Sequence, residues 1–428
     1  MDDNPHPEYI AIEQLCIGVF VHLDLGWMEH NFSRSSFIIK NSNQIAAIKK
    51  LGLNRIRFDP TLSERQPLPL APVTTASVVQ PKPVPVSAEE IEMINTKKTS
   101  IERLNQQRIA MAQCKKQFLK AAGTLKDISK NIFSRPQQAN QDAEELVQQM
   151  LGSLLANKNI VIHLMSDQAG GEEVYHHSLN VAVLAMLLAK ELSRSAEEIQ
   201  LLGVGCLFHD IGKIEIPDWL VRKTGGLTRA EQNLMQQHCE YGEAIAHKVG
   251  LPDKAIDIII QHHECFDGSG YPKRLKGESI SQLARIVAIV NTYDNHCNQR
   301  NPGDILTPHE ALSFMFARQG SLFDQAPLSV FIRCMGVYPP GTIVRLSDST
   351  LGMVISVNSS KPLRPSVLIY DAAVPKSDAI IIDLLNEPEL NIMASLKPAQ
   401  LPQEVFDYLS PRKHITYFFD TERTGGKA

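Results

Sequence analysis

The sequence predicts a mainly α-helical protein, in which a helical bundle follows a small α+β module and precedes a small β-rich tail. Three observations predict this arrangement. Apolar residues repeat at three- and four-residue steps from about 140 to 335. Six prolines between positions 67 and 85 separate this part from the N-terminal residues. After the Pro-Pro-Gly sequence at 339–341, short β-branched segments replace the helical pattern.

Residues 1–62 are expected to form the α+β module. β-branched and aromatic residues predict a strand over 16–25. A short helix over 44–51 and a strand over 54–58 follow. The proline-rich residues 63–88 are expected to be an extended linker, because such composition disfavours a packed element.

Residues 89–135 are polar and helix-prone, and we expect a helical connector. Its apolar positions recur at roughly helical spacing: Ile91, Ile94, Ile101, Leu104 and Ile109. One interpretation is a coiled-coil element that pairs two copies in a homodimer. The other is a solvated helix that packs on its own domain.

The bundle itself is expected over 140–338, with short loops and few alternating β-branched residues. Its predicted helices cover 143–155, 175–192, 196–209, 228–249, 252–263, 281–296 and 308–318. The extension over 339–420 is expected to hold strands at 341–346, 352–357, 366–369 and 379–383.

The composition excludes several classes of protein. A net charge of −4 gives no general attraction for a nucleic acid polymer. The seven scattered cysteines are odd in number and form no CxxC pair, which favours free thiols in a reducing compartment. The N-terminus lacks a signal-peptide pattern, and the longest apolar run, 179–192, is too short to span a bilayer. We therefore expect a cytoplasmic protein without a membrane segment.

Two motifs carry the chemistry. His209 and Asp210 lie in HDIGK, and His262 and His263 lie in HHECFDGSGYP. Imidazole and carboxylate ligands together suit iron, manganese, zinc or nickel, and an aspartate can bridge two ions. Bridged ions activate water and neutralise phosphate charge. These pairs therefore favour a metal-dependent phosphohydrolase.

Four further residues are candidate ligands on neighbouring helices: Glu173, His177, His238 and Asp294. Glu173 precedes His177 by four residues, which places both on one helix face. Taken alone, His238 is better explained as a hydrogen-bonded histidine and Glu173 as a solvated acid. The order of histidine and aspartate along successive helices favours ligands instead, because ligands in a bundle must face one another across its core.

These motifs resemble the HD-GYP family, a branch of the HD metal phosphohydrolases that hydrolyse cyclic di-GMP. The resemblance covers about 140–335 and rests on HSLNVAVLA, LFHDIGKIEIPD, MQQHCEYG and the complete HHExxDGxGYP signature. Residues 8–60 resemble a small domain of unknown function that often precedes such modules. The resemblance implies a helical core with two or three divalent ions, iron or manganese, and hydrolysis of cyclic di-GMP to pGpG and then GMP.

The resemblance also implies roles for individual residues. The implied metal ligands are His177, His209, Asp210, His238, His262, His263 and Asp294, with Asp210 bridging two ions and Glu173 supplying a carboxylate to a third. His209, Asp210 and Lys213 form the implied catalytic set, in which Lys213 reaches the substrate phosphate. The glycine-rich loop supplies Gly268, Gly270, Tyr271 and Pro272 for contact with the substrate, or for docking of a diguanylate-cyclase (GGDEF) protein.

One segment departs from the family pattern. The run NHCNQRNPGDILTPHEA after Asp294 keeps Arg300 but lacks a second basic residue that clamps phosphate or guanine. Arg285 or Lys273 could compensate. The departure leaves three alternatives open: cyclic GMP-AMP as the substrate, another nucleotide as the substrate, or a receptor for cyclic dinucleotides that has no activity.

Overall fold

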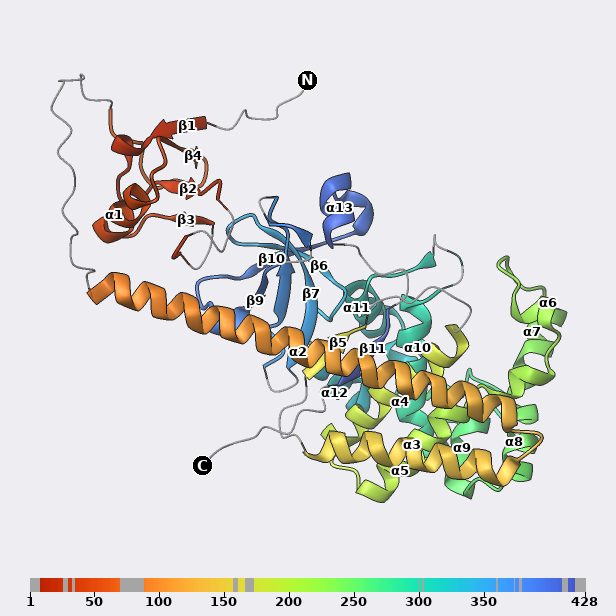
Figure 1. Ribbon diagram of the computed structural model, residues 1–428. Coiled ribbons are helices and arrows are strands. Elements are labelled where there is room, and N and C mark those ends of the chain that lie inside the picture. The colour runs from red at the N-terminus through yellow and green to blue at the C-terminus, as the bar shows by residue number, and fades with distance from the viewer. Residues whose placement is uncertain are drawn as a thin grey trace. The chain divides into compact units, whose positions relative to one another are not determined.

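The structure is a computed structural model (Figure 1) that describes residues 8–25, 30–32, 35–69, 88–156, 161–165, 173–299, 301, 304–358, 361–372, 374–376, 379–409 and 415–419. The described residues fall into two compact units. One holds those up to Arg108 together with Ser347–Thr350 and Ile369–Ile381, and the other holds the rest. Helices predominate, which confirms the predicted mainly α fold.

The N-terminal residues form a four-stranded antiparallel sheet and one helix, as the α+β prediction required. The strands are β1 (Glu8–Ala11), β2 (Phe20–His22), β3 (Ser36–Ile38) and β4 (Arg55–Asp59), in the order β1-β4-β2-β3. Helix α1 (Ser42–Lys50) begins where the Asn41 side chain accepts a hydrogen bond from Gln44 N. The strand expected over 16–25 is restricted to β2, because Gly18 turns the backbone with a φ of +97°.

The residues predicted as a helical connector form the helix α2 (Ala88–Asn131), and their role as a connector stays a prediction. Its apolar positions do not all face a core: Leu104 is buried, whereas Ile109 is 54% exposed. The side chains of Ile91 and Ile94 lie outside the described residues.

The bundle is built around α4 (Glu173–Glu191), whose residues from Leu179 to Ala189 are all buried. A helix that is apolar on every face belongs in the centre of a protein. It packs against α5, α10 and α12. The longer helices of the bundle are α3 (Pro136–Ala156), α5 (Ala196–Phe208), α7 (Arg229–Gln236), α8 (His238–Val249), α9 (Asp253–Gln261), α10 (Gln282–Cys297), α11 (Pro308–Arg318) and α12 (Gln325–Met335). The short η3 (Ile211–Glu215) and α6 (Asp218–Val221) follow α5.

The single helix predicted over 228–249 is wrong, because the chain forms α7 and α8 with Gln237 between them. The His238 ring bonds to the carbonyl oxygen of Met235 (Nδ1 to O, 2.7 Å). The interruption makes the Met235 carbonyl oxygen, at the end of α7, available to the ring.

A second sheet combines strands from distant parts of the chain. Its path is β10 (Ile392–Leu396), β6 (Ile343–Leu346), β7 (Leu351–Asn358), β5 (Val161–Leu164) and β11 (Tyr417–Phe419), and β8 (Ser366–Ile369) joins β7 to β9 (Ile381–Asp383). Strands were predicted at β6 to β9, and the structure confirms them. Strand β5 lies within the stretch 140–335, for which only helices were predicted. Strands β10 and β11 and helix α13 (Gln403–Leu409) were not predicted.

Gly212 allows η3 to lie directly against α8. A Cβ atom at this position would lie 1.9 Å from the carbonyl oxygen of His238 and 2.5 Å from Gly242 N. Both neighbours are backbone atoms, so neither can rotate away.

We expect Gly212→Ala to lower the free energy of unfolding by about 1–3 kcal/mol, because an overpacked site must shift its backbone. Gly123→Ala is the matched control, since a Cβ there meets no atom within 4 Å. That variant should be neutral or raise the free energy by roughly 0.5–1 kcal/mol, as expected for alanine in place of a mid-helix glycine. Urea unfolding measures both, and equal stabilities would contradict the packing argument.

Candidate metal centre

Three histidines occupy equivalent places at helix ends. His209 follows α5, His262 follows α9, and His238 begins α8 just after the end of α7. Each ring Nδ1 lies 2.7–2.8 Å from the carbonyl oxygen of the residue three positions earlier: Cys206, Ile259 and Met235, respectively. Carbonyl groups at the end of a helix are available for such bonds. Local helix termination therefore fixes the direction of all three rings.

These bonds determine which ring nitrogen carries the proton. A carbonyl oxygen only accepts, so Nδ1 must donate, and Nε2 of the neutral ring presents a lone pair. The Nε2 atoms of His238 and His262 face each other at 3.3 Å. Burial lowers the pKa of both rings, so neither carries a second proton. Two lone pairs cannot bond to each other, and a cation would satisfy both.

Asp210 stands between two such pairs. Its Oδ1 lies 3.4 Å and 3.7 Å from Nε2 of His238 and His262, and its Oδ2 lies 3.6 Å and 3.5 Å from Nε2 of His177 and His209. Oδ1 is buried and has no hydrogen-bond partner among the described residues. A buried oxygen without a partner is costly. A carboxylate placed in this way fits a bridge between two metal ions.

The donor atoms form two groups that share Asp210. One group is Asp210, His238, His262 and His263, and the other is His177, His209 and Asp210. Within each group the donor atoms all lie within 4.8 Å of one another. The residue types and their spacing therefore fit two divalent cations.

The charges at this centre also suit a metal. Burial opposes the negative charge of Asp210 and so tends to raise the pKa of its carboxyl group. The Lys213 ammonium, which donates to Oδ2, and the surrounding imidazoles outweigh this effect. They hold the pKa of Asp210 well below its usual value. Burial lowers the pKa of His209 to about 4. The centre thus contains an ionised carboxylate and, apart from His177, imidazoles that resist protonation. These are the states in which such groups bind metals.

The glycine-rich loop after His263 is folded closely on that histidine. A Cβ at Gly270 would lie 2.3 Å from Cys265 N and 2.5 Å from the carbonyl oxygen of His263. The Tyr271 ring stacks on the His263 ring, with centroids 4.6 Å apart. The buried Glu264 carboxylate accepts hydrogen bonds from the backbone N–H groups of the residues at 273 and 275, at 2.7 Å and 2.9 Å. Much of the motif therefore positions a candidate ligand.

The other predicted residues of this loop contribute to its backbone and its outer wall. Gly268 adopts a φ of +86°, which favours glycine. Pro272 lines a pocket of about 280 Å³ together with Gly270, Tyr271 and amide side chains of α7.

Asp294 lies outside both donor groups. Its Oδ2 faces Nδ1 of His177 at 2.5 Å, and its Oδ1 accepts hydrogen bonds from the amides of Asn180 and Asn298. In this structure Asp294 orients a candidate ligand, and its direct ligation stays a prediction. Sequence reasoning missed the two asparagines, although Asn180 lies three residues after His177 and Asn298 four after Asp294, on shared helix faces.

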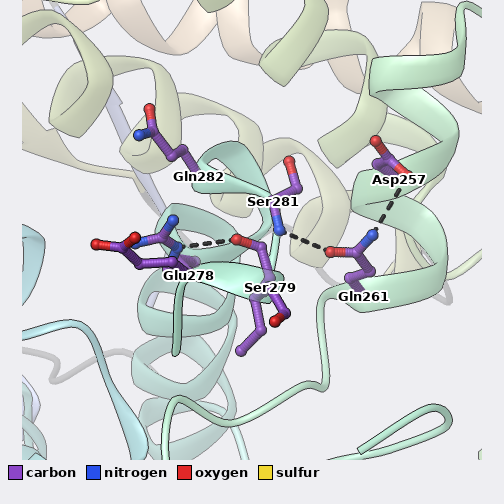
Figure 2. A pocket seen from close by; sticks show the side chains of 8 residues that line it. Asp257, Gln261, Glu278, Ser279, Ser281 and Gln282 are labelled. Carbon is purple, nitrogen blue, oxygen red and sulfur yellow. Dashed lines mark hydrogen bonds between the residues drawn. The ribbon is translucent and has the colours of Figure 1, made fainter. Parts of the chain in front are cut away.

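The guanidinium of Arg285 bonds to residues outside the two groups. Its guanidinium bonds to Asp324 at 2.8 Å and to the carbonyl oxygen of Ile280 at 3.0 Å. It lines a separate polar pocket of about 390 Å³ (Figure 2), in which Gln261 bonds to both Asp257 and Ser281. These contacts give no support to a substrate role for Arg285. Arg300 and the side chain of Glu173 lie outside the described residues.

The buried imidazoles predict how the stability of metal-free protein depends on pH. An unfolded imidazole titrates near 6.5, whereas the pKa values of His209, His238, His262 and His263 are lowered by burial. Below that pH the unfolded state binds more protons than the folded state. The free energy of unfolding should therefore be highest above about pH 6.5 and should fall between about pH 6.5 and pH 5. His177 has the opposite effect on the free energy of unfolding. Burial lowers its pKa, but Asp294 raises it by more, so the folded state binds this proton more readily than the unfolded state.

Urea unfolding of chelator-treated protein across this range measures the effect. His209→Gln should show a smaller fall than the wild type, because it lacks one of the four groups. Stability that rises on acidification would contradict neutral buried rings.

Comparisons with known proteins identify families that match parts of the chain. A family model described as an HD domain matches residues 91–326, a domain of unknown function (DUF3391) matches 9–143, and a KOW domain associated with HD domain matches 343–404. None of the helices in the described part of the chain has both the length and the hydrophobicity of a membrane-spanning segment.

Three curated relatives are similar to parts or most of the chain. A cyclic di-GMP phosphodiesterase of Pseudomonas aeruginosa is 27% identical over 91% of this chain and 92% of its own length. A cyclic di-GMP phosphodiesterase response regulator of Xanthomonas campestris is 36% identical over 35% of this chain and 40% of its own. A 3'3'-cGAMP-specific phosphodiesterase of Vibrio cholerae is 33% identical over 39% of this chain and 33% of its own.

The resemblance carried by the histidine and glycine motifs is confirmed, including the N-terminal domain of unknown function. Because the matching model spans more than half of the sequence, this chain belongs to the HD domain family.

Proposed function

We propose that the protein is a metal-dependent phosphodiesterase that hydrolyses cyclic di-GMP to pGpG, with GMP as the product of a second cut, and so lowers this second messenger in bacterial signalling. The observation that carries the proposal is the position of Asp210, whose two oxygens each face a pair of imidazole nitrogens. Relatives that bear the name cyclic di-GMP phosphodiesterase support the choice of substrate.

The residues that would hold the ions are the members of the two donor groups, His177, His209, Asp210, His238, His262 and His263. Bound divalent ions, iron or manganese, supply Lewis acidity that activates water and neutralises phosphate charge. Asp210 is the one carboxylate within these groups. The imidazoles are neutral, so a single carboxylate would offset only part of the charge of two bound divalent ions. The centre would then carry a net positive charge, which attracts a phosphodiester.

Lys213 adds a partly exposed cation beside Asp210. Its ammonium donates to Oδ2 of Asp210, and its side chain is 33% exposed. The Lys213 side chain can therefore rotate, so that its ammonium contacts a substrate phosphate instead of the carboxylate. In that position the ammonium stabilises negative charge as it develops and can donate a proton to the leaving oxygen.

The pocket beside the glycine-rich loop supports a substrate with nucleobases. Asn233, Gln236, Gln237 and Arg274 are among the residues that line it. Amide side chains pair with both donors and acceptors on the edges of bases. Cyclic GMP-AMP is the second candidate substrate, because a relative from Vibrio cholerae bears that specificity in its name and the two substrates share the phosphodiester.

Further proposals rest on the sequence motifs. These are a third ion held by Glu173, ligation by Asp294, substrate contacts by Gly268, Gly270, Tyr271, Pro272, Arg285 and Arg300, docking of a GGDEF protein on the loop, pairing of two copies through α2, and a cytoplasmic location.

Turnover tests the proposal directly. Protein loaded anaerobically with Fe²⁺ or Mn²⁺ should convert cyclic di-GMP to pGpG faster than it cleaves cyclic GMP-AMP. Asp210→Asn should lower the rate by more than roughly 100-fold, because both groups lose their shared carboxylate. Tight binding of cyclic di-GMP with no product would reject the enzyme in favour of a receptor, and preferential cleavage of cyclic GMP-AMP would establish the second substrate.

Lys213→Gln should lower kcat by about 100-fold, the usual effect of losing one charge-stabilising donor in a transition state. Lys223→Gln is the matched control, because that ammonium bonds to Glu231 of α7 and to neither donor group. Steady-state kinetics at saturating metal compare the two variants. Equal kcat values would remove Lys213 from the mechanism.

A further inference from the structure

The C-terminal strand β11 is buried together with the residues just before it. Ile415, Tyr417 and Phe419 are 7%, 0% and 1% exposed. The strand pairs with β5 through its backbone and also packs against α4, the helix that carries His177. It therefore reaches the neighbourhood of the donor groups from the far end of the sequence.

Two asparagine amides join this segment to the bundle. The Asn298 Oδ1 accepts from Ile415 N at 2.7 Å, and its Nδ2 donates to Ile415 O at 2.9 Å. The Asn180 Oδ1 accepts from Tyr417 N at 2.7 Å. Both amides use Nδ2 to donate to the same carboxylate oxygen, Oδ1 of Asp294. Each amide thus bonds through its oxygen to the backbone at 415–417 and through its NH₂ group to the carboxylate, and the NH₂ group of Asn298 also bonds to Ile415 O.

The backbone of the strand determines which way these amides face. The N–H groups of Ile415 and Tyr417 need acceptors, so each amide must turn its oxygen toward the strand. Its NH₂ group then faces Asp294. A reversed amide would place its oxygen against the carboxylate and leave a buried N–H group unpaired, which is unfavourable on both sides.

Asp294 in turn orients His177, a member of one donor group. With Oδ1 held by two amides, Oδ2 faces Nδ1 of His177 at 2.5 Å. The Nε2 of His177 is thereby directed toward Oδ2 of Asp210, 3.6 Å away. His238 and His262 depend instead on bonds to carbonyl oxygens within their own segments.

We propose that the segment 415–419, which contains β11, is a positioning element of the metal centre. Asn180 and Asn298 are the positioning residues that couple this segment, through Asp294 and His177, to one of the two metal-binding groups. The inference rests on the proposed metal centre, though not on the identity of the substrate. Metal binding by the group of His177, His209 and Asp210 would therefore depend on the segment 415–419. Metal binding by the group that contains His238, His262 and His263 would not.

Titration of the full-length, chelator-treated protein with Mn²⁺ tests this coupling, with the free ion measured by electron paramagnetic resonance. In Asn180→Leu and Asn298→Leu, one class of Mn²⁺ site should keep its affinity. The other should weaken by about 10–100-fold, the usual cost of removing a partner that orients a ligand. Asn298→Asp provides a second variant, because it keeps the acceptor for Ile415 N but loses both donors and places a carboxylate against Asp294. It should show the same selective loss.

Tyr417→Phe is the matched control on the same strand. It removes a buried hydroxyl that bonds to Tyr293 at 2.8 Å and to the carbonyl oxygen of Pro340 at 3.1 Å, but keeps the backbone bond to Asn180. Its free energy of unfolding should fall while both Mn²⁺ affinities stay at wild-type values.

The proposal is overturned if the asparagine variants bind Mn²⁺ like the wild type, if they weaken both classes of site equally, or if Tyr417→Phe causes the same loss. Because Mn²⁺ binding is measured without substrate, the outcome is separate from that of the turnover assay. Wild-type protein that binds two ions and cleaves no cyclic dinucleotide would reject the proposed activity and leave the coupling in place.

Discussion

The bond between each ring Nδ1 and a carbonyl oxygen at a helix end is the interaction on which the centre depends. It fixes the tautomers of His209, His238 and His262 and turns their Nε2 lone pairs toward Asp210. No separate scaffold is needed, because helix termination supplies the carbonyl groups. At His238 the break between α7 and α8, where one helix was predicted, supplies this carbonyl group. Local backbone structure and site chemistry therefore have a common cause.

Close backbone packing keeps these helix ends together. Gly212 lets η3 lie on α8, and Gly270 lets the glycine-rich loop fold onto His263. Tyr271 then covers the His263 ring. The glycines of the two motifs thus serve the geometry of the centre as well as any contact with a substrate. The C-terminal strand adds a constraint from the opposite end of the chain, through two amides and Asp294.

The sequence predicted the bundle and most of the donor set, because both leave local signals. Helical periodicity marks the helices, and paired histidine and aspartate residues mark the donors. It could not predict that Asp294 bonds to His177 instead of joining a donor group, since this depends on packing between α4 and α10. Strands β5 and β11 are short, and their pairing joins residues about 250 positions apart, which no local pattern records. The partners of Arg285 depend likewise on the distant Asp324.

If the imidazoles hold two divalent ions, Asp210 would bridge them. Low-temperature electron paramagnetic resonance of protein loaded with Mn²⁺ tests this bridge, because two ions that share a carboxylate are magnetically coupled. We expect a spin-coupled signal at two equivalents of Mn²⁺, and its loss in Asp210→Asn. Signals of isolated, uncoupled Mn²⁺ at every loading of the wild-type protein would contradict it.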